Sequence, residues 1–160
     1  MAETDFARHD HSTCIATGLA RAERICAARS LRLTPVRRRV LEILLGAHRA
    51  MGAYEVLEQL RADGRAAQPP VAYRALDFLV EHGLAHKIER LNAFVACANS
   101  GREHAPVFLI CRACGTVAET GWQPLAGEIG AAASARGFAV EAVVAEALGT
   151  CPNCREATAP

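Results

Sequence analysis

The stretch PPVAYRALDFLVEHGLAHKIERLNAFVAC, residues 69–97, decides the fold of the N-terminal half of the chain. Pro69-Pro70 predicts the start of a helix, because proline suits the first helical position, and His82-Gly83 predicts its end, because glycine adopts the left-handed conformation of a helix C-terminus. Two short alternating runs, 84–89 and 93–97, then flank a hairpin-length turn. We therefore expect a helix followed directly by a two-stranded wing.

This helix has an apolar side and a polar side. Helical spacing places Tyr73, Leu76, Leu79 and Val80 on the apolar side, and Arg74, Asp77 and Glu81 on the polar side. The polar side is therefore available to solvent or to a ligand.

Three more amphipathic helices are expected upstream, at about 17–30, from Thr34 to Gly46, and at 53–62. The second has clear start signals, with Thr34 as the N-cap and Pro35 at the first helical position. Helices followed by a two-stranded wing form a winged helix-turn-helix, in which the last helix enters the DNA major groove. A small helical domain that merely carries a hairpin is the alternative.

Charge is distributed unevenly along the chain. Residues 1–104 carry 15 basic and 12 acidic side chains, a net +3, whereas residues 105–160 carry 3 and 5, a net −2. Residues 21–39 alone contain seven arginines and one glutamate. This pattern favours a nucleic-acid module joined to an assembly module, with a solvated arginine-rich face as the alternative. Within it, Arg37, Arg38 and Arg39 are expected to contact phosphates.

Four of the seven cysteines form two C-x-x-C pairs, Cys111-Arg-Ala-Cys114 and Cys151-Pro-Asn-Cys154, with 36 residues between the pairs. Two such turns supply four thiolates, the tetrahedral ligand set that zinc prefers. The alternative, disulfides, needs an oxidising compartment. The first ten residues do not resemble a signal peptide, and no apolar run is long enough to span a bilayer. We therefore expect a cytoplasmic protein, no membrane association and a closed structural zinc site.

The C-terminal half is expected to mix strands with one helix. We expect strands at Val107–Ile110 and Thr116–Thr120, a helix from Pro124 to about Arg136, and a strand from Phe138 to about Leu148. An edge strand from each of two subunits could pair across a two-fold axis and make one continuous sheet. The whole chain is therefore expected to have an α+β fold.

Several motifs in a fixed order, spread over about residues 17–155, resemble the ferric uptake regulator family. They are Leu33-Thr-Pro-Val-Arg-Arg-Arg-Val40, Ala53-Tyr-Glu-Val-Leu57, Pro70-Val-Ala-Tyr-Arg-Ala-Leu-Asp-Phe-Leu79, Leu84-Ala-His-Lys-Ile-Glu89 and the C-x-x-C-G of residues 111–115. The resemblance implies a homodimeric, metal-activated repressor that binds a palindromic operator in double-stranded DNA. It also implies a flexible tail (1–16), a winged-helix DNA-binding domain (17–97), a hinge (98–105) and a zinc-stapled dimerisation domain (106–160).

The hinge favours the zinc-sensing branch of that family. Iron and peroxide sensors, the alternative, usually carry a histidine-rich stretch before the first C-x-x-C, whereas residues 101–106 contain one histidine. By resemblance, the regulatory zinc ligands are His86, Cys97, His104 and Glu119. One thiolate, two imidazoles and a carboxylate suit tetrahedral zinc and suit octahedral iron poorly. We therefore expect two zinc ions per subunit, the second of which links the two domains. The zinc-loaded repressor is expected to control zinc-uptake genes.

Tyr73 and Arg74 are expected to make the groove contact, because they match the recognition-helix motif of the family. That motif usually reads P-x-T-V-Y-R, whereas this chain has Val71-Ala72 before Tyr73. The missing threonine predicts a different or weaker operator preference. The tract His9-Asp-His11 with Cys14 is interpreted as part of the flexible tail, with weak metal binding as the alternative.

A zinc hydrolase or deaminase is the competing class of protein. A catalytic zinc site needs an open position and a general base. The deaminase signature is missing, because no His-x-Glu occurs and Cys151 follows a threonine rather than a proline. We therefore expect no enzyme.

Overall fold

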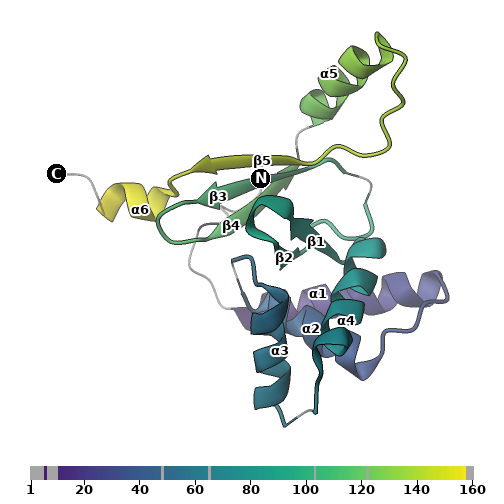
Figure 1. Cartoon of the computed structure of the whole chain (residues 1–160), viewed down its shortest axis with the longest axis vertical. Coiled ribbons are helices and arrows are strands. Elements are labelled where there is room, and N and C mark those ends of the chain that lie inside the picture. Colours follow the sequence, from purple (N-terminus) through teal and green to yellow (C-terminus); the bar gives the residue numbers. More distant parts are fainter. Residues whose placement is uncertain are drawn as a thin grey trace. The chain divides into compact units, whose positions relative to one another are not determined.

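The computed structural model describes residues 6, 11–47, 49–64, 66–102, 104–121 and 123–157. It divides into two compact units, one made of residues 8–101 and the other of residues 1–7 and 102–160. Both helices and strands are present, in agreement with the predicted α+β class (Figure 1). Among the described helices, none has the length and apolar character needed to cross a membrane.

The N-terminal unit consists of helices followed by a hairpin, as the sequence predicts. Its elements are α1 (His11–Ala28), α2 (Pro35–Leu45), α3 (Ala53–Ala62), α4 (Pro69–Glu81), β1 (Ala85–Ile88), the short 3-10 helix η1 (Glu89–Leu91) and β2 (Ala93–Ala96). β1 and β2 pair antiparallel, and Asn92 reverses the chain between them with a φ of 45°. The predicted wing is therefore present directly after α4.

Local signals set the ends of these helices. The Thr34 side chain accepts a hydrogen bond from the backbone N–H of Arg37 at 3.4 Å, which caps α2. At the start of α3, a Glu55 carboxylate oxygen accepts from the N–H of Gly52 at 3.0 Å. Gly83, with a φ of 68°, follows the end of α4. These caps account for the agreement between the predicted and observed bounds of α2, α3 and α4.

The core of this unit lies between the helices. α2 packs against α1, α3, α4 and β2. The side chains that are fully buried there include Val40, Leu44, Val56, Leu57, Leu60, Leu76 and Leu79. Met51 and Phe94 exchange backbone hydrogen bonds of 2.9 and 2.8 Å. The wing is therefore anchored to the helices through the connection between α2 and α3.

Two predictions for this unit were wrong. α1 begins at His11, so residues 11–16 are helical although a flexible tail was predicted there. The reason is that Ile15 continues the apolar side of α1 and packs against the core. Tyr73 does not lie on the apolar side of α4, where Ala72, Ala75, Leu76, Phe78 and Leu79 are buried instead. The tail residues 1–5 and 7–10, His9 among them, lie outside the described residues.

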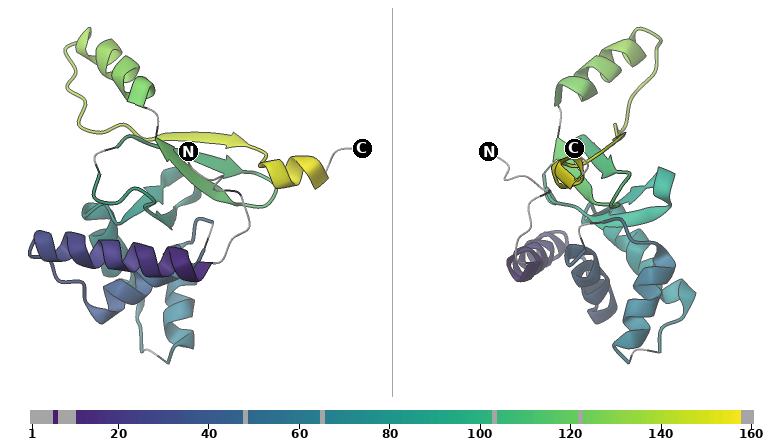
Figure 2. Two further views of the ribbon diagram at one scale, coloured as in Figure 1. Left: turned by 180° about the vertical axis from the view of Figure 1, so that it is seen from behind. Right: turned by 90° about the vertical axis from the view of Figure 1, so that its left-hand side faces the viewer.

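The C-terminal unit is a three-stranded sheet with helices. Its elements are β3 (Pro106–Cys111), β4 (Val117–Gly121), α5 (Gln123–Ser134), β5 (Ala145–Gly149) and α6 (Pro152–Ala157). β3 is the central strand, antiparallel to β4 and parallel to β5 (Figure 2). β3 and β5 are parallel neighbours, and such strands need a long connection. Between them the chain runs through β4 and α5.

The last strand is shorter than predicted. It starts at Ala145 rather than Phe138, and Phe138 is 66% exposed. The pairing register explains the difference, because Ala145 lies opposite Val107 and β3 has only one more residue, Pro106, on that side. Residues before Val144 therefore have no neighbouring strand to pair with within the described chain.

Candidate metal centre and nucleic-acid interface

The two C-x-x-C pairs meet in the C-terminal unit. The sulfur atoms of Cys111, Cys114, Cys151 and Cys154 all lie within 4.8 Å of one another. The Cys114 and Cys151 sulfurs are 3.7 Å apart. Four Zn–S bonds of about 2.3 Å in a tetrahedron separate neighbouring sulfurs by about 3.8 Å, whereas a disulfide bond is about 2.05 Å long. The four cysteines therefore fit a tetrahedral zinc ion.

Strand pairing brings the two pairs together. Cys111 ends β3, and the backbone N–H of Arg112 donates to the carbonyl of Gly149, at the end of β5, at 2.9 Å. Since β3 and β5 run parallel, their carboxyl ends lie at the same end of the sheet, and both cysteine pairs lie there. Gly115 closes the first turn, with a φ of 74° and a hydrogen bond from its N–H to the Cys111 carbonyl.

The thiols of this cluster differ in acidity. The backbone N–H of Cys151 donates to the Cys111 sulfur at 3.3 Å, and this contact and similar ones lower the pKa of Cys111 to about 6. In contrast, the neighbouring sulfurs, that of Cys151 first, raise the pKa of Cys154 to about 12. Hydrogen bonds to these sulfurs favour the protonated Cys154 thiol and so oppose a further negative charge in the cluster. A divalent cation would remove that opposition, since metal-bound thiols are deprotonated.

His104 and Glu119 form a second cluster in the same unit. His104 Nε2 lies 2.8 Å from Glu119 Oε1, and the two side chains are 15% and 4% exposed. The other ring nitrogen, Nδ1, lies 2.8 Å from the carbonyl oxygen of Arg102 and can only donate to it. A neutral His104 would then turn the lone pair of Nε2 toward a carboxylate. A proton or a metal cation between the two atoms makes this contact favourable.

His86 and Cys97 come together in the N-terminal unit. His86 lies on β1 opposite Val95, and Cys97 directly follows β2 and is buried. A ring nitrogen of His86 and the Cys97 sulfur lie within 4.8 Å of each other. The backbone N–H of Cys97 donates to the carbonyl of Leu84 at 3.0 Å, which fixes the position of the cysteine at the end of the wing.

The exposed face of α4 is polar and aromatic. Tyr73 is 42% exposed, and Arg74, also exposed, donates from Nε to the carbonyl of Pro70 at 3.1 Å. Ala72 is buried in the core, so this departure from the family motif does not face outward. Val71 is only half-buried, and of the two departures it is the one that can alter the outer face of the helix.

The three consecutive arginines of α2 have partners within their own unit. The Arg37 guanidinium stacks over the Phe78 ring at 3.7 Å, and Arg38 pairs with Glu23 at 3.2 Å. Arg39 donates to both carboxylate oxygens of Asp63, at 2.6 and 3.0 Å, and to Glu42 at 3.0 Å. The hydrogen bond to Asp63 is the main reason that the pKa of Arg39 is raised. Arg39 therefore ties α2 to the C-terminal end of α3.

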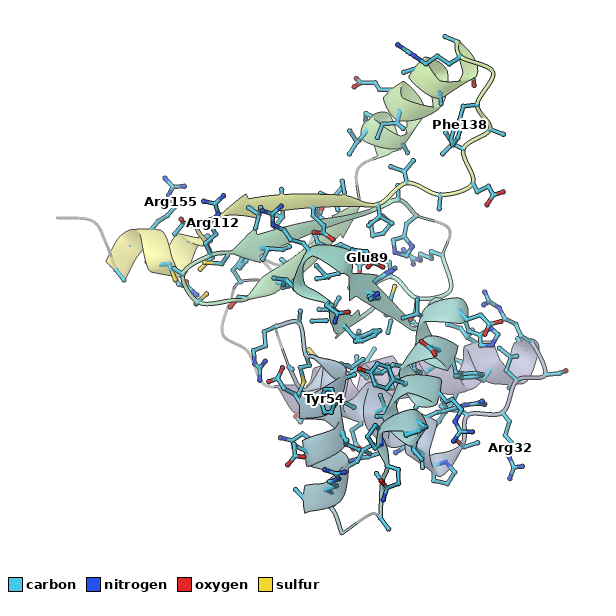
Figure 3. The ribbon with its side chains drawn as sticks, viewed as in Figure 1. Arg32, Tyr54, Glu89, Arg112, Phe138 and Arg155 are labelled. Carbon is cyan, nitrogen blue, oxygen red and sulfur yellow. The ribbon has the colours of Figure 1, made fainter. Side chains whose placement is uncertain are left out.

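Tyr54 was not predicted as a site residue. It lies at the start of α3 and is 67% exposed, and Figure 3 shows it on the N-terminal unit. Its neighbour Glu55 pairs with Arg49 at 2.7 Å. The signal for it in the sequence is an aromatic residue on the polar side of an amphipathic helix whose buried side carries Ala53 and Val56.

Comparison with known proteins places this arrangement in a family. The sequence model of the ferric uptake regulator family matches residues 28–146. The zinc uptake regulation protein of Escherichia coli (strain K12) is 41% identical over 142 residues, which cover 88% of this chain and 83% of that protein.

Two solved structures resemble most of the chain. The first is a zinc uptake regulator complexed with zinc and DNA, which is 40% identical with a TM-score of 0.86 over 89% of this chain and 96% of the other. The second is the crystal structure of holo XcZur, which is 39% identical with a TM-score of 0.81 over 88% of this chain and 98% of the other. The chain therefore belongs to the ferric uptake regulator family.

Proposed function

We propose that this chain is a zinc-responsive transcriptional repressor that binds the palindromic operators of zinc-uptake genes as a homodimer. The observation that carries the proposal is the pairing of a four-cysteine cluster with a second, mixed set of ligands in a chain whose α4 offers an exposed face. Similarity to a zinc uptake regulator complexed with zinc and DNA supports the same function. We place the protein in the cytoplasm and assign it no enzymatic activity.

The four cysteines are proposed to hold a structural zinc ion. Cys111 and Cys114 would bind it from the end of β3, and Cys151 and Cys154 from the start of α6. All four positions are then taken by protein, and no position is left open for a substrate. The site would join the ends of β3 and β5, and so stabilise the dimerisation domain, for which we propose residues 106–160.

The regulatory zinc ion is proposed to bind His86, Cys97, His104 and Glu119. The first two belong to the N-terminal unit and the last two to the C-terminal unit. Bound zinc would supply one positive centre for ligands from both units, across the proposed hinge at 98–105. The short contact between His104 and Glu119 supports a cation there, because it leaves two acceptor atoms facing each other when the histidine is neutral.

DNA binding is proposed to use α4. Tyr73 and Arg74 are exposed on this helix, and an arginine can donate two hydrogen bonds to guanine. The two recognition helices of a dimer must be spaced by about 34 Å to reach successive major grooves. Fixing the hinge would raise the fraction of dimers with that spacing. Arg37 and Arg38 remain the candidates for phosphate contacts, whereas the charge of Arg39 is balanced by Asp63 and Glu42.

The experiment is a mobility-shift assay with the full-length dimer and a palindromic zinc-uptake promoter. We expect two zinc ions per subunit, a shift with zinc, and release when a chelator removes the regulatory ion but leaves the cysteine site filled. A response to ferrous iron or to peroxide in place of zinc would assign the protein to another branch of the family. Equal binding with and without zinc would contradict the proposal.

A further inference from the structure

The chain that leaves the wing is tied to α1. The guanidinium Nη1 of Arg21 donates to the carbonyl oxygen of Ala98 at 2.6 Å. Ala98 directly follows Cys97, whose own N–H donates to the carbonyl of Leu84. The backbone is therefore held at Cys97 by Leu84, which directly precedes β1, and at the next residue by Arg21 of α1.

A second contact fixes the end of the same turn. Gly101 has a φ of 84°, and a Cβ atom added there would lie 3.0 Å from the terminal carbon of Ile25, one helical turn after Arg21. The turn 98–101 thus rests on α1 at its start and at its end. Only residues 102 and 103 then separate this fixed turn from His104.

We propose that Arg21 is a positioning residue for the regulatory metal ligand Cys97. The physical reason is that Cys97 has no regular secondary structure of its own, because β2 ends at Ala96. A cationic donor that holds the following carbonyl fixes the backbone on which the thiolate stands, and such supporting contacts tune metal affinity. Arg21 would act through Cys97 and touch neither zinc nor DNA.

This inference rests on the proposed regulatory site, so the experiment includes a variant of that site. Arg21→Met keeps the long apolar stem and removes the donor, Arg21→Lys keeps a cationic donor, and Arg24→Met changes an exposed arginine of the same helix as the matched control. Cys97→Ala removes the ligand itself. Each full-length dimer, with the cysteine site filled with zinc, is titrated with zinc in the presence of operator DNA.

We expect Arg21→Met to need about tenfold more free zinc for half-occupancy of the operator, as for other supporting contacts of metal ligands. At saturating zinc its operator affinity and its melting temperature should match the wild type. Arg21→Lys should restore most of the wild-type response to zinc, and Arg24→Met should need no more zinc than the wild type. Cobalt placed in the regulatory site should show a weakened thiolate-to-metal absorption band in Arg21→Met.

The possible failures are distinguishable. If Cys97→Ala shifts the titration and Arg21→Met does not, the role of Arg21 is wrong and the regulatory site stands. If Arg21→Met lowers the melting temperature, or lowers operator affinity at saturating zinc, Arg21 supports the fold rather than the ligand. If Cys97→Ala itself behaves as wild type, the proposed regulatory site is wrong, and the inference about Arg21 fails with it.

Discussion

Replacing Arg39 with methionine separates a structural role of this arginine from a role in DNA binding. Arg39 makes three charged hydrogen bonds, two to Asp63 and one to Glu42. All three side chains are about 30% exposed, so solvent weakens these ion pairs but does not cancel them. Exposed ion pairs contribute about 0.2–1 kcal/mol, and hydrogen bonds to charged groups about 1.5–3 kcal/mol when shielded. We expect an intermediate loss of about 1–2 kcal/mol in the free energy of unfolding.

The assay for Arg39→Met combines thermal unfolding with operator binding. In a unit of this size, 1 kcal/mol corresponds to about 4–8 °C in melting temperature, so the variant should melt several degrees lower. The double variant with Asp63→Asn should lose less than the sum of the single variants, because the two residues share the same interaction. The dependence of operator affinity on salt concentration should stay unchanged.

A phosphate contact would give the opposite result. Losing one phosphate contact per binding site reduces the slope of log affinity against log salt by about 0.9. Arg38→Met is the matched comparison, because Arg38 is more exposed and, among the described residues, pairs with one acidic side chain, that of Glu23. An unchanged melting temperature together with a reduced salt slope for Arg39→Met would refute the structural role.

Three further predictions concern other parts of the molecule. Cys154→Ser leaves three thiolates, so part of a zinc-folding energy on the order of 10 kcal/mol is lost, and we expect loss of the dimer or of soluble protein in size-exclusion chromatography; a stable dimer with an unchanged melting temperature would count against a structural site. Arg74→Ala should cost about 1–3 kcal/mol in binding to the operator and much less in binding to non-specific DNA, as measured by competition, and an equal loss on both would exclude base recognition. The hydrogen bond from Arg49, and then that from the Gly52 N–H, lowers the pKa of Glu55. The ionised Glu55 carboxylate therefore stabilises the fold above the unfolded pKa of about 4.3, and this stabilisation is lost as pH falls through the lower folded pKa. Because Arg49 and Glu55 are about half exposed, solvent screens their ion pair, and Glu55→Gln should lower the free energy of unfolding by only about 0.2–1 kcal/mol at pH 6. The difference should disappear in acid; a constant difference at all pH values would contradict the assignment.

The sequence predicts the helices and the wing well, because their signals are local. Thr34-Pro35 and His82-Gly83 specify the ends of α2 and α4 through contacts within a few residues, and the structure confirms them. The start of the last strand could not be predicted in this way. It depends on the register between Ala145 and Val107, which lie far apart in the sequence.

The candidate sites show the same division between local and non-local information. The C-x-x-C spacing predicts four thiolates that converge, and the structure brings them within 4.8 Å of one another. In contrast, the contact between His104 and Glu119 depends on where β4 lies relative to the segment before β3. The pairing of Arg39 with Asp63 was also beyond sequence reasoning, because Asp63 comes from the end of another helix.

The central claim is that zinc at His86, Cys97, His104 and Glu119 controls DNA binding. The most direct test is operator occupancy measured against free zinc for wild type and His104→Ala, both as dimers with filled cysteine sites. The account predicts that wild type binds the operator only as zinc rises. It also predicts that His104→Ala needs far more zinc than the wild type for the same operator occupancy. Its affinity for non-specific DNA should equal that of the wild type. A His104→Ala titration that overlays the wild-type curve, or operator binding that does not depend on zinc, would contradict it.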